Sequence, residues 1–231
     1  MGQVPLERAL SKLGVASRSQ TIKWIEAGLI AVNGRIIKDK NFLVVPEKAK
    51  ITVQGKLVAK VSNQTIILYK PKGVVTTKSD EKNRKTVYDL LPDDLKHLHP
   101  VGRLDMATTG LLIMTTDTQL SNHLTDPGNV VPRVYAVTVR GKITDEEVQQ
   151  ILAGIEDKGE LLKVNKVTLR KVSNKESHLI LELCEGKNRE IRRIFEALGT
   201  EVTALKRISF GRVTLGTLSL GEFKQIEINQ I

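Results

Sequence analysis

The stretch VGRLDMATTGLLIMTTD, residues 101–117, joins a polar turn directly to an apolar strand. Its first half carries Arg103 and Asp105 ahead of the small-residue turn TTG. The run LLIMTT that follows has the length of a buried strand. Because a charged pair just before a buried strand is held in place by rigid structure, Asp105 is a candidate functional carboxylate. It is equally a candidate turn cap, since Asp and Thr side chains bond to backbone amides in turns.

Beyond this stretch, short strand patterns outnumber helical ones. The strands are predicted at 65–69, 111–116, 133–141, 166–172, 178–184, 201–208 and 223–228, and the helices at 121–126, 145–154 and 192–199. No sequence repeat of fixed period is present. We therefore predict an α+β domain on a mostly antiparallel mixed sheet, which occupies residues 61–231.

The first quarter of the chain has a different pattern. Apolar residues at i, i+3, i+4 and i+7 predict a helix that ends at Gly14. Ser17 or Ser19 can cap a second helix, which Gly28 ends. The pair Asn33-Gly34 is typical of a two-residue hairpin turn, and the run ITVQG predicts a further strand. The apolar residues are Leu6, Ala9, Leu10 and Leu13 in the first helix and Ile22, Trp24 and Ile25 in the second.

We expect these elements to form a separate domain over residues 1–60, with a linker at 56–64 where no apolar pattern repeats. The whole chain has a formal net charge of +10, and residues 1–60 hold 11 basic and 4 acidic side chains. Such an excess favours a polyanionic partner, although charged helix faces are often only solvated. The candidate binding residues are Arg8, Lys12, Arg18, Lys23, Arg35, Lys38 and Lys40.

Several classes of protein are disfavoured by what the sequence lacks. The single cysteine, Cys184, allows no internal disulfide and no cysteine-cluster zinc site, and it agrees with a reducing cytoplasm. No apolar run approaches the roughly 20 residues of a membrane span, and the amphipathic amino terminus does not resemble a signal peptide. Gly-rich phosphate loops, the Gly-x-Ser-x-Gly elbow and His-Glu-x-x-His are also missing. We therefore expect no metal and no cofactor.

Two further stretches carry candidate site residues. In CEGKNREIRRIFEALG, Lys187, Arg189, Arg192 and Arg193 crowd four cations into seven residues around an apolar helical stripe. Such crowding favours a nearby anion, either RNA phosphate or the carboxylate of Asp105. In PRVYAVTV a tyrosine sits within a strand, where it can either pack in the core or stack on a base.

The amino-terminal motifs LERALSKLGVASR, IEAGLIAVNGRII and KAKITVQG resemble the RNA-binding domain named after the fourth protein of the small ribosomal subunit. The resemblance covers about residues 4–56. It implies that two helices and a hairpin present a basic face to structured RNA. Since such domains are appended to many proteins, this one indicates the partner and not the reaction.

The remainder resembles the pseudouridine synthases that modify ribosomal RNA. GRLDMATTGLLIMTTD carries the resemblance most specifically, and GKNREIRRIFEALGTEVTALKRISFG, LSLGEFKQI, KPKGVVTT and KTVYDLLP support it over about residues 64–228. It implies isomerisation of a uridine without cofactor or metal. GKNREIRR and KTVYDLLP are closer to the branch that acts on 23S rRNA than to the small-subunit branch.

The resemblance also implies roles for individual residues. Asp105 matches the nucleophilic aspartate, and Arg103 matches the residue that fills the space left when the target nucleotide flips out. Tyr135 matches the tyrosine that stacks on uracil and helps to remove the proton from its carbon 5. Arg133, two residues earlier, stands where a lysine often does.

For the basic partner of Asp105 the resemblance points to Lys187, with Arg189 or Arg192 as alternatives in the crowded stretch. Arg189, Arg192 and Arg193 are then expected to bind RNA with Arg103, and Ile191 is expected to pack under the base. Whether Asp105 attacks the base or the ribose stays open, as does the identity of the uridine.

We thus expect a cytoplasmic, monomeric enzyme that acts on ribosomal RNA, either free or within a precursor particle. One alternative is an RNA-binding or ribosome-assembly factor without activity, for which the basic arm would suffice. Another is an aspartate-dependent hydrolase of a small substrate, which the lack of a second acid near Asp105 disfavours.

Overall fold

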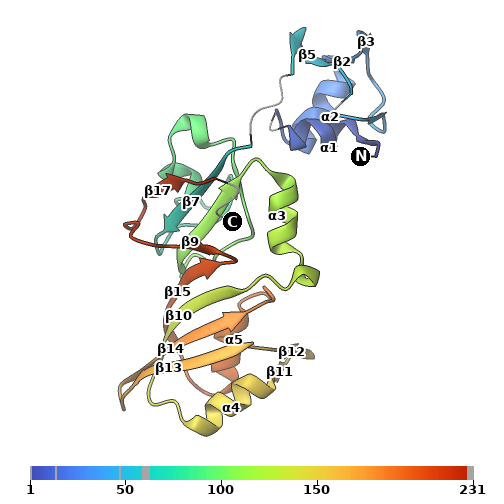
Figure 1. Cartoon of the computed structure of the whole chain (residues 1–231). Coiled ribbons are helices and arrows are strands. Elements are labelled where there is room, and N and C mark those ends of the chain that lie inside the picture. Colours follow the sequence, from blue (N-terminus) through green and yellow to red (C-terminus); the bar gives the residue numbers. More distant parts are fainter. Residues whose placement is uncertain (1, 14, 47, 59–62, 228–231) are drawn as a thin grey trace. The chain divides into compact units, whose positions relative to one another are not determined.

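The computed structural model describes residues 2–13, 15–46, 48–58 and 63–227. The chain separates into two compact units (Figure 1). The first comprises Met1–Gln64 with Thr116–Thr118, and the second comprises Thr65–Thr115 with Gln119–Ile231.

The first unit packs two helices against short strands. Helices α1 (Leu6–Lys12) and α2 (Arg18–Glu26) form where the apolar spacing predicts them. The hydroxyl of Ser17, one of the two expected caps, accepts a hydrogen bond from the backbone N of Gln20 at 3.2 Å. The strands are β1 (Val4–Pro5), β2 (Ile30–Val32), β3 (Arg35–Ile36), β4 (Leu43–Val44), β5 (Ile51–Val53) and β6 (Lys56–Leu57).

Four of these strands form a sheet in the order β3-β2-β5-β6, and β1 pairs with β4. The turn between β2 and β3 has positive φ at both Asn33 and Gly34, which confirms the predicted hairpin. The core includes Leu6, Leu10 and Ile25, all with no exposed surface. Burial of these apolar side chains is the main stabilisation available to so small a unit.

The expected linker is wrong at its first residues, because Lys56 and Leu57 form β6 and Val58 packs on the core of the first unit. A second turn with positive φ, at Gln54 and Gly55, returns the chain into this strand. Residues 59–62 of the expected linker, and Gly14, lie outside the described residues.

The second unit is built on one large mixed sheet. Its main strands are β7 (Thr65–Lys70), β9 (Thr109–Thr115), β10 (Arg133–Arg140), β13 (Lys166–Val172), β14 (Glu176–Leu183), β15 (Val202–Phe210) and β17 (Phe223–Gln225). They lie in the order β13-β14-β10-β15-β9-β7-β17. All neighbours on this path are antiparallel except β9 and β15, which are parallel. The predicted α+β class and mostly antiparallel sheet are confirmed.

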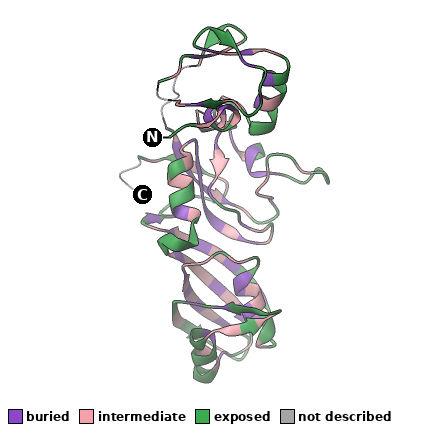
Figure 2. Ribbon diagram, turned by 90° about the vertical axis from the view of Figure 1, so that its right-hand side faces the viewer, coloured by how far each residue is buried: buried purple, intermediate pink, exposed green. Residues whose placement is uncertain are grey.

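In its described part, the unit also contains three helices and several small elements. The helices are α3 (Thr118–Thr125), α4 (Asp145–Ala153) and α5 (Glu190–Ala197), close to the predicted ranges. The small elements are η1 (Val87–Leu90), η2 (Asp93–Leu95), β8 (His99–Pro100), η3 (Pro127–Asn129), β11 (Ile155–Asp157), β12 (Glu160–Leu162) and β16 (Val213–Thr214). Figure 2 shows buried residues concentrated in the sheet and exposed ones on the outer sides of the helices.

The sheet has separate apolar cores on its two halves. One core lies under β10, β14 and β15 and takes Ile194 and Phe195 from α5. The other half buries both faces of β7 and β9: Leu68 and Leu112 lie in one cluster, and Ile67, Leu111 and Ile113 in another. The parallel pairing of β9 with β15 joins the halves.

Gly110 permits this join. It pairs with Arg207 of β15 and has a φ of +112°. A Cβ at this position would overlap the backbone nitrogen and carbonyl of Arg207. Because both colliding groups are backbone, they cannot swing aside as a side chain would.

Gly110→Ala is therefore expected to lower the free energy of unfolding by about 3 kcal/mol or more, through overlap and backbone strain together. Gly141→Ala is the matched control, because φ is also positive there (+78°) but the space for a Cβ is open. That variant should lose only about 1–2 kcal/mol. Chemical denaturation measures both changes, and similar losses would contradict the close approach at Gly110.

Candidate active site

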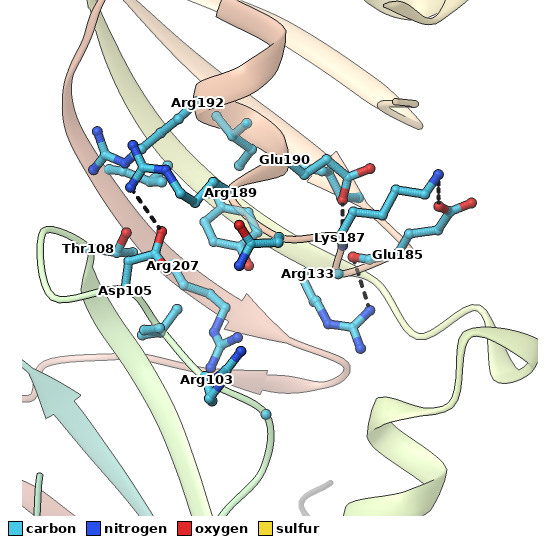
Figure 3. A pocket seen from close by; sticks show the side chains of 18 of the residues that line it. Arg103, Asp105, Thr108, Arg133, Glu185, Lys187, Arg189, Glu190, Arg192 and Arg207 are labelled. Carbon is cyan, nitrogen blue, oxygen red and sulfur yellow. Dashed lines mark hydrogen bonds and ion pairs between the residues drawn. The ribbon is translucent and has the colours of Figure 1, made fainter. Parts of the chain in front are cut away.

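A pocket of about 480 Å³ lies in the second unit, where several segments meet (Figure 3). Most of its lining comes from the loop before β9, strands β10 and β15, and the loop that leads into α5 with the first turn of that helix. This volume lies within the range typical of small-molecule sites. Its charged lining comprises six cations and three carboxylates: Arg103, Arg133, Lys187, Arg189, Arg192 and Arg207, and Asp105, Glu185 and Glu190.

The loop that carries Asp105 is fixed on both sides of that residue. The hydroxyl of Thr76 donates a hydrogen bond to the carbonyl of Leu104 at 2.8 Å. The backbone N of Gly73 donates to the carbonyl of Met106, also at 2.8 Å. The segment KPKGVVTT thus holds the aspartate loop, although the two are about thirty residues apart in sequence.

Lys70 completes this attachment from inside the protein. Its side chain is fully buried, and its ammonium donates to the carbonyls of Pro71, Asp105 and Thr108 at 3.0, 3.1 and 2.8 Å. Burial lowers the pKa of Lys70 to about 8, while attraction to Asp105 opposes that shift. Sequence reasoning assigned no role to Lys70. The available signal was a lysine that ends an otherwise apolar strand.

The turn at Asp105 is closed by its backbone and not by its side chain. The N–H of Thr108 donates to the backbone carbonyl of Asp105 at 3.0 Å, and the carboxylate faces the pocket. One carboxylate oxygen lies 3.8 Å from a guanidinium nitrogen of Arg189. The carboxylate is 39% exposed, so a substrate can reach it.

The expected pair between Lys187 and Asp105 is wrong. The Lys187 ammonium lies 2.5 Å from the carboxylate of Glu185 and donates to the carbonyl of Leu161 at 2.7 Å. Arg189, one of the two alternatives, provides the cation beside Asp105. Its position just before α5, with φ of +50°, brings it to this side of the pocket.

The other two arginines of this stretch make different contacts. Arg192 lines the pocket and donates to the carbonyls of Val202 and Ala107 at 3.0 and 3.3 Å. Arg193 binds within the protein, since its guanidinium contacts the carboxylates of Asp157 and Glu160 at 2.5 and 2.6 Å. Arg193 thus ties α5 to β11 and β12, which differs from the RNA contact expected of it.

The remaining predicted residues do lie around the pocket. Tyr135 lines it from β10 and also packs against two of the apolar clusters, so it combines both interpretations of a strand tyrosine. Arg103 lines it from an exposed position in the loop. Ile191, 4% exposed, lines it from the first turn of α5.

Sequence reasoning missed the buried arginines that line this pocket. The guanidinium carbons of Arg133 and Arg207 lie 4.6 and 4.9 Å from the ring centroid of Phe210. Arg133 also donates to several backbone carbonyls, among them those of Cys184 at 2.9 Å and Leu124 at 3.0 Å. The available signal was an arginine within each of the strand patterns RVYAVTVR and VTALKRISF.

In the first unit the candidate RNA-binding cations lie at the surface. Exposed positions are occupied by Arg8, Arg18, Lys23, Arg35, Lys38 and Lys40. Lys12 belongs to α1, but its side chain lies outside the described part of the chain. Exposed Lys and Arg side chains can reach RNA phosphates and release the counterions condensed on the RNA.

The described residues offer neither a metal site nor a membrane span. No group of three or more His, Cys, Asp and Glu side chains among them could hold a metal ion. No helix in the described part of the chain is long and apolar enough to cross a membrane.

Comparison with known proteins gives a consistent result. Residues 64–197 match the family model described as RNA pseudouridylate synthase, and residues 4–51 match that of the S4 domain. A protein of Aquifex aeolicus named "Uncharacterized RNA pseudouridine synthase" is 35% identical over 231 residues, which are 100% of this chain and 92% of that protein.

A Bacillus subtilis protein named "Ribosomal large subunit pseudouridine synthase B" is 31% identical, over 98% of this chain and 93% of that protein. The solved structure described as "Crystal structure of pseudouridylate synthase" superposes with a TM-score of 0.69 and 28% identity, over 98% of this chain and 97% of that chain.

Lys70→Met removes the buried ammonium and leaves three backbone carbonyls without their donor. We expect about 1–3 kcal/mol lower stability at pH 7 and lower turnover, because the loop of Asp105 loosens. The folded chain releases the Lys70 proton from about pH 8, and the unfolded chain keeps it to about 10.5. The stability of the wild type relative to Lys70→Met should therefore rise across this interval.

Chemical denaturation at several pH values, with turnover assays at pH 7, tests both effects. Lys72→Met is the matched control, because Lys72 is exposed and lies two residues away. It should follow the wild type in stability and turnover. If the stabilities of Lys70→Met and the wild type change in parallel from pH 8 to 10.5, the buried lysine does not titrate there.

Proposed function

This chain belongs to the RNA pseudouridylate synthase family, and from that membership we propose that it converts a uridine of large-subunit ribosomal RNA to pseudouridine. It is a pseudouridine synthase with an amino-terminal S4 domain. The large-subunit substrate rests on the names of relatives such as the Bacillus subtilis protein. The observation that carries the proposed mechanism is the exposed carboxylate of Asp105, held beside Arg189 in a mostly cationic pocket.

Asp105 is the proposed nucleophile. The reaction breaks the bond between uracil and ribose, turns the uracil, and joins its carbon 5 to the ribose. An ionised carboxylate can attack either ring or sugar and can stabilise positive charge on the ribose. The guanidinium of Arg189 lies 3.8 Å from this carboxylate and places a positive charge beside it. The fixed loop around Asp105 keeps the carboxylate oriented without reorganisation during the reaction.

Access to the base requires that the nucleotide leave its helix, at a cost of a few kcal/mol in unstacking. Arg103 is proposed to fill the vacated space, which agrees with its exposed position in the pocket lining. Tyr135 is proposed to stack on the uracil and to help remove the proton from carbon 5, with Ile191 beneath the base. Lys187 is proposed to support the loop before α5 through Glu185, with Arg189 as the partner of Asp105.

The S4 domain is the proposed anchor on RNA, through the exposed cations of the first unit. Together with Arg189 and Arg192, they would offset the cost of flipping through contacts with phosphates. We propose that a monomer acts in the cytoplasm, on free ribosomal RNA or on a precursor particle, without a cofactor.

Asp105→Asn separates catalysis from binding. The change removes the carboxylate charge and nearly preserves volume. Release of tritium from RNA with uridine labelled at carbon 5 should fall by more than about 10³-fold, while RNA affinity and cooperative unfolding persist. Release near the wild-type rate would exclude Asp105 as nucleophile and would revive the binding-factor and hydrolase alternatives.

Asp89→Asn is the matched control, because Asp89 is an aspartate that only caps a turn. Its carboxylate accepts hydrogen bonds from the backbone and the hydroxyl of Thr86 at 2.7 and 3.0 Å. This variant should lose about 1 kcal/mol of stability and keep its tritium release.

A fourfold variant tests the RNA anchor. Arg18→Gln, Lys23→Gln, Arg35→Gln and Lys38→Gln together remove four exposed charges of the first unit. Affinity for rRNA fragments should fall, and the slope of log affinity against log salt should decrease by roughly 0.7–0.9 for each phosphate that the variant no longer neutralises.

The control removes the same charge from the edge strand β13 and its turn, with Gln at Lys166, Arg170, Lys171 and Lys175, all exposed. It should leave the slope nearly unchanged. Equal slopes for the two fourfold variants would show that net charge alone matters.

A further inference from the structure

Arg207 is a buried cation with an unused hydrogen-bond donor. Its side chain is only 2% exposed, and its Nε donates to the carbonyl of Leu111 at 2.8 Å. Its Nη2 is buried and has no hydrogen-bond partner among the described residues. A buried donor on a charged group is destabilising when it has no partner, so a ligand that supplies the partner is the natural explanation.

A β-bulge places Arg207 beside the proposed base site. Along β15 the pairing with β10 runs from Ser209 opposite Val134 to Arg207 opposite Tyr135, so Ile208 is the extra residue. Residues that pair directly across antiparallel strands lie on the same face, with Cβ atoms about 5 Å apart. The bulge therefore gives Arg207 and Tyr135 a common face, and both line the pocket.

The surroundings of Arg207 do not neutralise its charge. Among the described residues, no carboxylate lies within ion-pair distance of its guanidinium. A second buried cation, Arg133, packs against the same ring of Phe210 as Arg207. Burial foremost, and repulsion from Arg207, lower the pKa of Arg133. The pocket wall thus favours a negative charge next to Arg207.

We infer that Arg207 is a further catalytic residue, whose Nη2 donates to a carbonyl oxygen of the flipped uracil and stabilises the negative charge that the ring acquires. The inference rests on the proposed function. The inference goes beyond the proposed function because it assigns the group that stabilises the charged uracil.

The charge on the ring follows from the chemistry. When the bond between ribose carbon 1′ and uracil N1 breaks, its electron pair stays on the uracil, and the charge spreads to the two carbonyl oxygens. After the ring turns, an electron pair of the ring forms the bond from carbon 5 to carbon 1′. The proton of carbon 5 then leaves, and N1 gains one, so the composition is unchanged. Attack of Asp105 on carbon 6 would push the electron pair of the carbon 5–carbon 6 double bond onto a carbonyl oxygen, and the carbon 6–oxygen bond would break again before product release.

The alternative ligand is an RNA phosphate. Its oxygens would also attract Arg207, but the residue opposite Arg207 is Tyr135, which is proposed to stack on the base. A uracil stacked on Tyr135 would therefore lie on the face of the sheet that also carries Arg207. A donor in a water-excluded wall is most effective where charge develops during the reaction.

The test compares two leaving groups. Arg207→Met keeps an unbranched side chain and removes the cation and the donor. Single-turnover rates are measured by loss of the parent nucleoside from rRNA fragments with uridine or 5-fluorouridine at the target site. Loss of one such donor should slow uridine about 10²–10³-fold. Fluorine stabilises the uracil anion by itself. The rate reduction that Arg207→Met causes should therefore be at least about tenfold smaller with 5-fluorouridine than with uridine. RNA affinity should stay within about threefold.

Arg133→Met is the matched control, since Arg133 is buried against the same ring and donates to backbone carbonyls. Its rates should change by the same factor with both nucleosides. Arg207→Lys keeps the charge without the planar fork, and it should show a smaller dependence on the leaving group than Arg207→Met. Equal factors for uridine and 5-fluorouridine in a folded Arg207 variant would overturn the inference.

A measurement on the unaltered protein covers the case in which neither Arg207 variant folds. 5-Nitrouracil, which is ionised at neutral pH, should inhibit the full-length protein at least about tenfold better than uracil. Equal or weaker inhibition would overturn the inference. The wild type separates the two proposals: if it forms no pseudouridine in large-subunit rRNA, the proposed function fails, whatever the variants show.

Discussion

The close backbone approach of β9 and β15 at Gly110 is the constraint on which the rest of the second unit depends. It joins two half-sheets that each have their own apolar core. Asp105 precedes β9 on one side of this join, while Tyr135 and Arg207 belong to the other side. The pocket therefore exists only when both halves are folded and paired. The backbone approach that joins the two half-sheets therefore also brings Asp105, Tyr135 and Arg207 together.

The local pattern of apolar residues was sufficient to predict most of the helices and strands. The strand pattern at 133–141 predicted β10, and the apolar helical stripe that ends at Gly199 predicted α5. The short strands β1 and β4 were missed, since two residues carry no period. The parallel pairing of β9 with β15 was also beyond local pattern, because it joins residues almost a hundred positions apart.

Motifs located the candidate site, and packing decided which side chains meet there. The sequence placed Lys187, Arg189, Arg192 and Arg193 in one crowded stretch, but their spacing alone could not assign partners. Helix phase and the adjoining β11 and β12 direct Arg193 to Asp157 and Glu160. Lys70 and Arg207 were overlooked because charged residues are rarely fully buried, so a strand pattern that contains them is expected to expose them. Their burial is visible only once the sheet is closed.

The left-handed backbone of Arg189 has a consequence for how this protein can change. A non-glycine residue with φ of +50° costs about 1–2 kcal/mol, which asparagine or glycine would largely avoid. The same backbone turn brings the guanidinium to Asp105. Folding stability and the electrostatics of the site are thus in conflict at this one residue, and mutants selected only for heat resistance are expected to drift here toward a more stable, less active protein.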